Sequence, residues 1–495
     1  MGDNGWRIPA SYHRWLLAAL GTAAVAWSVV LLPSGCQGSS SARKPSLPAS
    51  PLESARASSA GAPAAPNTPV ETKAPERPKP PALRPVLPSS EPVIRVRVAT
   101  VRSEPIVLSH PSGWLFVKPD GEAAGRTFRT PVSIRPAAKG WLVTESGDGA
   151  SRVSVDGDGP LRIEPMKGWN REIQWKGGDW PGDATLVRRP DEGPDAADLV
   201  FAVPMETYLP GVLAKELYKG WSDDAYRAQA VAARSYALCE HAWWDGRRHY
   251  DVVAGQASQA WIGATADATS RRAVQDTAGQ YLVFDGRVVP AYYSSCCGGA
   301  PASATDAIRE GSWMDIAPLT VDGREDARPR GCCEKAPTAR WKVTLGTAEL
   351  ARRLDAWATR EGRKDLGSVS GVKSITTAEE NAAGRPVSFR ITDPRGRKVV
   401  WDSEDLRYAV NASASGSKDS LKSGFVTPRV EGGKVVFEGR GHGHGAGMCQ
   451  YGAEAMGKSG RGYRQILTRY YPGAQVEQGG SSSAANASAS LPGGE

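Results

Sequence analysis

The hydrophobic and polar positions of the chain form β-type patterns from residue 94 to about residue 203. Ile94 to Val98 alternates strictly between apolar and charged residues, which predicts a strand with one buried face. Leu199 to Val203 is an apolar run and predicts a further strand. Between these two lie short apolar runs separated by Gly, Pro and Asp, which predict a small β module: Trp114–Val117, Val132–Ile134, Trp141–Val143 and Leu161–Ile163.

Helical spacing begins directly after this region. Pro210 suits the first turn of a helix, and Val212 and Glu216 lie one turn apart on the same face. Gly220 is expected to end this helix. Because a half-buried apolar face disfavours the charged form of a carboxylate, we expect the pKa of Glu216 to be raised, as a general acid requires. The alternative is an ordinary solvated carboxylate on a helix surface.

A second helix is predicted from about Asp223 to Trp244. Ser222 is the expected N-cap, and the two aspartates of the first turn suit the positive end of the helix dipole. The helix is rich in alanine, so other backbone can approach it closely, and it carries the polar residues Gln229 and Arg234. Cys239 within it is most simply a small core residue.

A β-hairpin is predicted further along the chain. Its strands are Tyr281–Phe284 and Val288–Tyr293, and Asp285-Gly286 between them is a strong signal for a tight turn. The remaining predicted elements are a strand at Trp341–Thr344, a helix at Thr347–Arg360, a hairpin of Val387–Ile391 and Lys398–Trp401, and helices at Ser403–Val410 and Tyr463–Tyr471.

Together these patterns predict an α+β fold. We expect a single large mixed domain over residues 94–477, with a β-rich part at 94–198 followed by a part at 199–477. A chain of 495 residues has ample length for a core of this size.

The two ends of the chain have different compositions. Residues 1–36 contain an uncharged apolar run from Trp15 to Leu32, which predicts a signal peptide or membrane anchor, and Cys36 at its end is a candidate for lipoprotein acylation. Residues 37–93 are rich in Pro, Ala and Ser and predict a disordered linker, and residues 478–495 predict a disordered tail. We therefore expect the protein to leave the cytoplasm, either secreted or held at the membrane by its N-terminus.

The net charge of the chain indicates which class of binding partner to expect. The chain has 61 basic and 53 acidic residues, a formal net charge of +8, which suits an anionic polymer such as a cell wall. It has no basic cluster interleaved with aromatic residues, so nucleic acid is not an expected partner.

Four of the seven cysteines form two adjacent pairs, Cys296-Cys297 and Cys332-Cys333. Outside the cytoplasm oxidation is available, so one or two disulfides among these four are the favoured interpretation. Four thiols can also form a tetrathiolate zinc site, but the usual C-x-x-C spacing is absent. Free thiols remain a third alternative, and no other metal or cofactor is expected.

A glycine-rich segment, GRGHGHGAGMCQYGA, runs from Gly439 to Ala453. Its glycines allow backbone N–H groups to approach a ligand, and a helix opening near Cys449 can donate hydrogen bonds to ligand oxygens. The alternatives are a tight-turn scaffold and a metal site at His442 and His444, which lacks an evident third ligand.

Two segments resemble the signatures of the stage II sporulation protein D family, the SpoIID/LytB domain. The run from Tyr208 to Ala237 resembles YLxGVxxxE followed by KAQAVAARTYA, and the glycine-rich segment resembles GxGxGHGxGMSQYGA. The chain departs from the family at Leu217-Tyr218, where Met-Pro is usual, at Ser294, where His is usual, and at Cys449, where Ser is usual.

The resemblance implies lytic transglycosylation of peptidoglycan glycan strands, preferably strands that lack stem peptides, in a glycan-binding groove. It makes Glu216 the catalytic acid and base, with Glu206, Asp251 and Glu454 still open as companion acids. The residues expected to hold the sugar are Gln229, Arg234, Ser235, His444, Gly447 and Gln450. Arg234 has a structural clamp as its alternative role.

Two other functions remain open at this point. Some family members are amidase enhancers, so the chain can instead be a non-catalytic wall-binding activator of an N-acetylmuramoyl-L-alanine amidase. An exported scaffold protein that binds no glycan is the third alternative.

Overall fold

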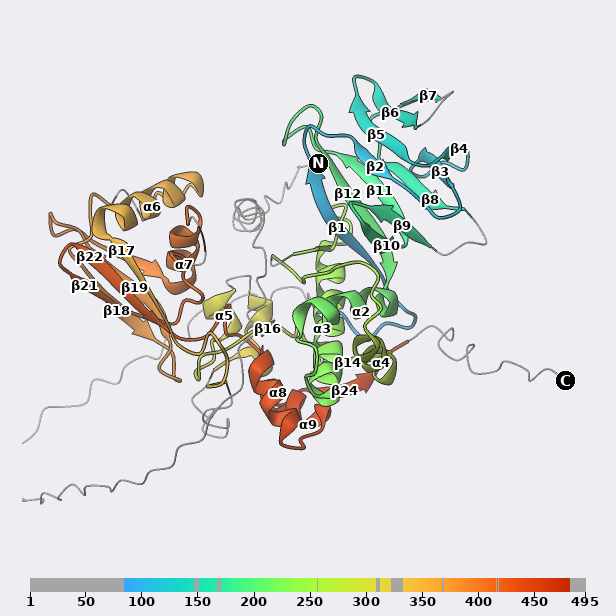
Figure 1. The fold of residues 1–495 in the computed structure, drawn as a ribbon. Helices are drawn as coiled ribbons and strands as arrows, with labels where there is room; N and C mark the ends of the chain where they lie inside the picture. Colours follow the sequence, from blue (N-terminus) through green and yellow to red (C-terminus); the bar gives the residue numbers. More distant parts are fainter. Residues whose placement is uncertain are drawn as a thin grey trace, which may run out of the picture. The chain divides into compact units, whose positions relative to one another are not determined.

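Figure 1 shows the computed structural model, which describes residues 84–146, 151–166, 171–255, 257–308, 312–321, 333–366, 369–414, 416 and 418–480. The predicted anchor at 1–36, most of the predicted linker, Cys332 and residues 481–495 lie outside these ranges. Within them, no helix combines the length and the apolar character that a membrane crossing needs.

The N-terminal part is β-rich, as predicted. A seven-stranded sheet has the order β13-β1-β12-β11-β8-β3-β4, and its neighbours pair antiparallel except for β1 and β13. Its strands are β1 (Val93–Val101), β3 (Trp114–Pro119), β4 (Arg126–Arg129), β8 (Leu161–Pro165), β11 (Asp183–Arg188), β12 (Ala197–Pro204) and β13 (Val252–Val253).

Two smaller sheets complete this part, a four-stranded one in the order β2-β5-β6-β7 and the hairpin of β9 and β10. Their strands are β2 (Ile106–Leu108), β5 (Val132–Ala137), β6 (Gly140–Glu145), β7 (Arg152–Asp156), β9 (Glu172–Trp175) and β10 (Gly178–Pro181). Each apolar run singled out in the sequence lies in one of the strands of this region.

Strand β12 leads directly into helix α2 (Met205–Glu216). The helix starts earlier than predicted, so Pro210 lies inside it, where it cannot donate the intrahelical hydrogen bond. The helix also ends at Glu216 rather than at Gly220, because Leu217 adopts an extended backbone. Helix α3 (Asp223–Trp244) confirms the predicted bounds, and the side chain of Ser222 caps its first turn.

The predicted hairpin is present, but its second strand is shorter than the predicted Val288–Tyr293, because residues 289–292 lie outside the strands. Strands β14 (Gln280–Phe284) and β15 (Arg287–Val288) pair around Asp285-Gly286, both of which have positive φ. The C-terminal strand β24 (Gln475–Gln478) pairs with β14 on its other edge. Helices α4 (Ala268–Asp276), α5 (Ala304–Ala307), α8 (Gln450–Lys458) and α9 (Tyr463–Tyr470) belong to the same part of the chain.

A short pair of parallel strands joins the region after the hairpin to the glycine-rich segment. Strand β16 (Tyr293–Ser294) follows the hairpin and pairs with β23 (Met448–Cys449) in the glycine-rich segment. One hydrophobic core therefore gathers residues from Ile94 to Ala336 and again from Ala446 to Ala474.

The intervening segment has a hydrophobic core of its own, from Val343 to Phe437. It contains two three-stranded sheets, β17-β22-β21 and β18-β19-β20. Its elements are β17 (Trp341–Gly346), α6 (Thr347–Arg360), β18 (Ser374–Glu380), β19 (Pro386–Thr392), β20 (Lys398–Asp402), α7 (Ser403–Asn411), β21 (Val426–Glu431) and β22 (Lys434–Gly439). The described residues thus form a mixed α and β protein with eight α-helices and two cores.

We expect Trp401→Ala to destabilise the protein by about 3–5 kcal/mol, because Trp401 is fully buried in the second core and its removal leaves a cavity. Its neighbour Val400 is 49% exposed, so Val400→Ala is the matched control and should cost less than about 1 kcal/mol. Urea unfolding of both variants measures the difference. Equal costs would contradict the placement of Trp401.

Candidate active site

Glu216 is the last residue of α2, and its carboxylate is held by two donors. The backbone N–H of Ala260 donates to Oε1 at 2.9 Å, and Nε2 of Gln450 donates to Oε2 at 3.3 Å. The side chain is half-buried. The helix end, a loop and the start of α8 therefore meet at one carboxylate.

Burial raises the pKa of Glu216 above its ordinary value of 4.5. The hydrogen bonds from Ala260 and Gln450 and the positive charge of Lys215 act in the opposite direction but do not outweigh burial. This direction agrees with the one expected from the apolar helix face.

Gln450 connects Glu216 to a second buried amide. Its Nε2 also donates to Oε1 of Gln229, on α3, at 3.5 Å. Gln229 is fully buried, and its own Nε2 has no hydrogen-bond partner among the described residues. An unpaired buried amide N–H is costly, so this group is an unusual feature of the site.

Gln450 itself is placed by the cap of helix α8. The thiol of Cys449 accepts the N–H of Gly452 at 3.3 Å, which fixes the first turn that Gln450 opens.

Tyr208, Gln259 and Tyr293 form a hydrogen-bonded group that includes the residue before Ala260. Tyr208 donates its hydroxyl proton to Oε1 of Gln259 at 3.1 Å, and Nε2 of Gln259 donates to the carbonyl of Ala233 and to the hydroxyl of Tyr293. Burial and the charge of Glu216 raise the pKa of both phenols well above their ordinary range, so they stay protonated. This group holds the backbone next to Ala260, the donor to Glu216.

Gln259 was not among the residues predicted for the site. The signal in the sequence is that the stretch Gln259–Gly263 resembles a segment of the SpoIID/LytB family.

His444 and Gly447 have structural contacts. Nδ1 of His444 accepts the N–H of Ala446 at 3.1 Å, so Nε2 carries the proton and donates to the carbonyl of Tyr293 at 2.9 Å. Burial lowers the pKa of His444 to about 4, and the imidazole is neutral at neutral pH. A Cβ on Gly447 would lie 1.9 Å from the Tyr292 carbonyl oxygen. Both residues therefore fasten the glycine-rich segment to β16, and a role in holding sugar stays a prediction.

Arg234 and Ser235 lie fully buried in α3. Arg234 forms a two-pronged ion pair with Glu206 at 2.9 and 2.6 Å and donates to the Gln280 carbonyl. The hydroxyl of Ser235 accepts the N–H of Leu282 at 2.9 Å and donates within its own helix. These contacts tie α3 to α2 and β14, which favours the structural-clamp alternative for Arg234.

The three carboxylates that the sequence left open as companion acids have other partners. Glu206 pairs with Arg234, Asp251 with Arg95 and His241, and Glu454 with Lys458 and the N–H and hydroxyl of Ser222. None of the three is a hydrogen-bond partner of Glu216. The site is therefore built around one carboxylate and two amides.

Three aromatic rings lie next to this site in the chain and contact one another. The ring centroids of Tyr218, Trp221 and Tyr451 are 5.1–6.0 Å apart. Tyr218 follows Glu216 by two residues and is 47% exposed, and Tyr451 follows Gln450. We call these three residues the aromatic cluster. The predicted glycan-binding groove stays a prediction.

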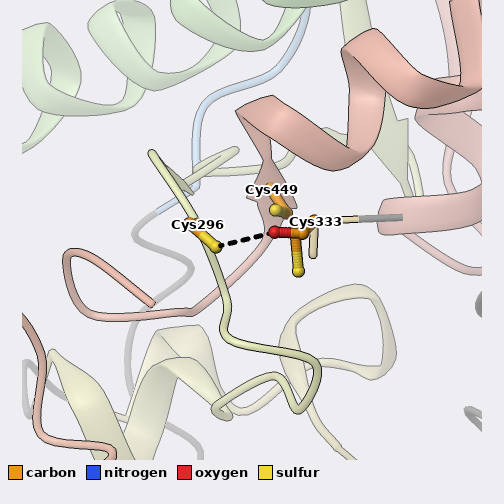
Figure 2. Close-up of side chains that lie close together, drawn as sticks. All are labelled: Cys296, Cys333 and Cys449. Carbon is orange, nitrogen blue, oxygen red and sulfur yellow. Dashed lines mark hydrogen bonds between the residues drawn. The ribbon is translucent and has the colours of Figure 1, made fainter. Parts of the chain in front are cut away.

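None of the five described cysteines is joined by a disulfide in this structure. Cys239 is buried in α3, in line with its expected role as a small core residue. Figure 2 shows that Cys296, Cys333 and Cys449 converge from three segments, and their sulfurs all lie within 4.8 Å of one another. Cys297 adds a sulfur 3.7 Å from that of Cys333.

Three of the four predicted cysteines lie among the described residues. Cys333 lies beside Cys296 and Cys297, as both the disulfide and the zinc interpretation require, whereas Cys332 lies outside the described residues. Cys449 was not in the predicted set, although its replacement of the usual serine was visible in the sequence. Disulfide, zinc and free thiol stay open on this geometry alone.

The sequence pattern of the family described as "SpoIID: Stage II sporulation protein" matches residues 195–284. The chain contains a domain of the SpoIID family. This SpoIID region carries Glu216, Gln229, Arg234 and Gln259, whereas Gln450 and the glycine-rich segment lie beyond the matched residues.

Curated relatives extend the similarity. The amidase enhancer of Bacillus subtilis is 27% identical over 298 residues, which cover 54% of this chain and 39% of that protein. Stage II sporulation protein D of the same organism is 23% identical over 291 residues, 56% of this chain and 75% of that protein. An uncharacterized protein of Brachyspira hyodysenteriae is 26% identical over 283 residues, which cover 57% of this chain and 69% of that protein. The chain thus matches about two fifths of the amidase enhancer and is distantly homologous to it.

The raised pKa of Glu216 has a consequence for stability. Between pH 4.5 and the raised pKa, Glu216 binds more protons in the folded protein than in the unfolded chain. Its favourable contribution to the free energy of unfolding is therefore complete below pH 4.5 and is lost as the pH rises through the folded-state pKa. We expect Glu216→Gln to be more stable than wild type at pH 7 and equally stable below pH 4.5. Urea unfolding from pH 4 to pH 8 measures this. A wild type that is more stable than the variant at pH 7 would contradict the burial argument.

We expect Glu206→Gln to destabilise the protein by about 3 kcal/mol, because it leaves the buried Arg234 without its carboxylate. The matched control is Glu438→Gln, which breaks an exposed pair with Arg429 and should cost about 0–1 kcal/mol. Thermal and urea unfolding measure both. A loss below about 1 kcal/mol for Glu206→Gln would show that the clamp contributes little.

Proposed function

We propose that this protein cleaves the glycan strands of peptidoglycan by lytic transglycosylation, with Glu216 as the only acid and base. The observation that carries the proposal is a half-buried carboxylate with a raised pKa, held by two donors, with no hydrogen bond to another carboxylate among the described residues. The SpoIID domain and the homology to stage II sporulation protein D support a role at the cell wall.

In the proposed reaction the carboxyl group of Glu216 acts first as the general acid and then as the general base. Protonated Glu216 donates its proton to the glycosidic oxygen as the bond from this oxygen to C1 of N-acetylmuramic acid breaks. The resulting carboxylate then accepts the proton of the sugar's own C6 hydroxyl while O6 bonds to C1. The products are a free 4-hydroxyl on N-acetylglucosamine and a 1,6-anhydro end, and no water is consumed.

This route explains why one carboxylate suffices. Glycoside hydrolases usually need a second carboxylate as nucleophile or as base for water. Here the substrate supplies the nucleophile, so the pairing of Glu206, Asp251 and Glu454 with other groups is no obstacle.

Gln450 and Gln229 are the groups proposed to orient the sugar. Gln450 donates to Glu216 and stabilises its charged form, which appears midway through the reaction. The unpaired Nε2 of Gln229 is the donor we assign to a sugar oxygen. The exposed ring of Tyr218 offers an apolar face to a sugar ring near Glu216.

We further propose that the substrate is a strand without stem peptides and that the protein works outside the cytoplasm. The first part rests on the family resemblance. The second rests on the apolar N-terminal run of the sequence and on the location of the proposed substrate.

The second candidate is a non-catalytic enhancer of a cell-wall amidase. It is favoured by the similarity to a protein named amidase enhancer. In that case the same site binds glycan without cutting it, and an amidase partner performs the hydrolysis.

We expect wild-type protein to produce anhydro-muramyl ends from purified glycan strands, and Glu216→Gln to reduce the rate by about 10²-fold or more, because the acid and base are removed. Strands with and without stem peptides are compared, and mass spectrometry identifies the ends. The matched control is Glu379→Gln, an exposed glutamate on β18, which should keep the wild-type rate.

Each outcome selects one function. Loss of cleavage in Glu216→Gln alone supports the transglycosylase. Cleavage that survives in Glu216→Gln contradicts the assignment of the acid. Strands bound but uncut by both proteins, together with stimulation of an amidase, support the enhancer.

A further inference from the structure

The surface beside Glu216 combines exposed lysines with an exposed aromatic ring. Tyr218, Lys219 and Gly220 are all exposed in the segment that joins α2 to α3. Lys215, which precedes Glu216 in the last turn of α2, is exposed as well. The edge of the proposed active site therefore carries two cationic side chains and one ring that water reaches.

Lys215 and Lys219 form no ion pair with a carboxylate among the described residues. Asp267, an acid near Lys219, caps helix α4 instead. Hydrogen bonds from Ser270 and, less strongly, the charge of Lys219 lower the pKa of Asp267, yet no ion pair joins the lysine to this carboxylate. Within the described part of the chain, both ammonium groups are therefore able to bind an anionic group of a ligand.

The aromatic cluster supplies the apolar part of the same surface. Tyr218 is 47% exposed, and its ring centroid lies 5.4 Å from that of Trp221 and 6.0 Å from that of Tyr451. These two contacts hold the exposed ring in place beside Glu216. A fixed aromatic face suits the C–H face of a pyranose ring, because both are apolar and flat.

A muramic acid residue without a stem peptide presents both complementary features. It has a pyranose ring, and its lactyl ether ends in a carboxylate that is charged at neutral pH. When a stem peptide is attached, this carboxylate becomes a neutral amide. Two cations beside an aromatic face therefore match the bare sugar better than the substituted one.

We propose that Lys215, Lys219 and Tyr218 form a subsite for the free lactyl carboxylate of N-acetylmuramic acid. This subsite presupposes the proposed function, because its ligand is part of the same glycan strand. It assigns the preference for strands without stem peptides to particular side chains. Tyr218 stands where the family usually has Pro, so the exposed ring is a feature of this chain.

Lys215 also has a simpler structural role that the experiment has to separate. A positive charge in the last turn of α2 suits the negative end of the helix dipole. Loss of this effect would lower stability and would weaken the binding of every glycan alike. A role in recognition, by contrast, affects only ligands that carry the carboxylate.

Binding to the full chain with Glu216→Gln tests the proposal, because this change is expected to leave the ligand uncut. The probe is a tetrasaccharide of alternating N-acetylglucosamine and N-acetylmuramic acid with free lactyl carboxylates. It is compared with the same tetrasaccharide whose lactyl groups are methylamides. We expect calorimetry to show about 5–10-fold tighter binding of the free acid at low salt, and a smaller difference at high salt.

Variants in the same background identify the residues. Lys215→Gln and Lys219→Gln should each reduce the preference for the free acid by about 2–5-fold and keep the affinity for the amide. Tyr218→Ala should weaken both ligands by a similar factor of about 5, because its ring contacts the sugar rather than the charge. Lys434→Gln changes an exposed lysine on β22 and is the matched control, which should bind both ligands as before.

Two results would overturn the proposal. One is equal affinity for the free acid and the amide at low salt. The other is a double variant of Lys215 and Lys219, shown to be folded by circular dichroism, that keeps the full preference. The expected preference in a chain whose wild type never cuts the strand would support the subsite and contradict only the transglycosylase.

Discussion

The position of Gln450 beside Glu216 depends on a backbone contact that leaves no room for a side chain. The carbonyl of Tyr292 accepts the N–H of Met448 at 3.0 Å and the hydroxyl of Tyr471 at 2.7 Å. Gly447 passes so close to this carbonyl that any Cβ would collide with it. This contact sets the register of β16 and β23, and through it two segments far apart in the sequence share one site.

The electrostatics of Glu216 match a group that must exist in both protonation states. Burial favours the neutral acid, whereas the donors Ala260 and Gln450 stabilise the carboxylate. These opposing effects suit a residue that gives a proton and then takes one back. Tyr208 and Tyr293 stay protonated nearby and therefore add no competing charge.

Local features of the fold could be predicted from the sequence. The cap at Ser222, the bounds of α3 and the Asp285-Gly286 turn follow from short-range rules, and all three are present. The start of α2 could not be predicted in this way, because Pro210 suggests a first turn whereas the approach of β12 sets the helix start at Met205. Tertiary context outweighed a local preference.

The site was predictable only in part for the same reason. Glu216 and Gln450 stood out in their motifs, but nothing local indicates that Ala260 and Gln259 lie behind the carboxylate. The gathering of Cys333 and Cys449 joins distant segments and needed the structure. The family signature left Arg234 open between sugar binding and a structural clamp, and its ion pair with Glu206 favours the clamp.

Isotope labelling tests the central claim, a single carboxylate that uses the substrate's own hydroxyl, most directly. Glycan strands are digested by wild-type protein in water enriched in ¹⁸O, and the new ends are analysed by mass spectrometry. Our account predicts 1,6-anhydro ends with no ¹⁸O. Reducing ends that carry one ¹⁸O atom each would show that water is the nucleophile and would contradict it.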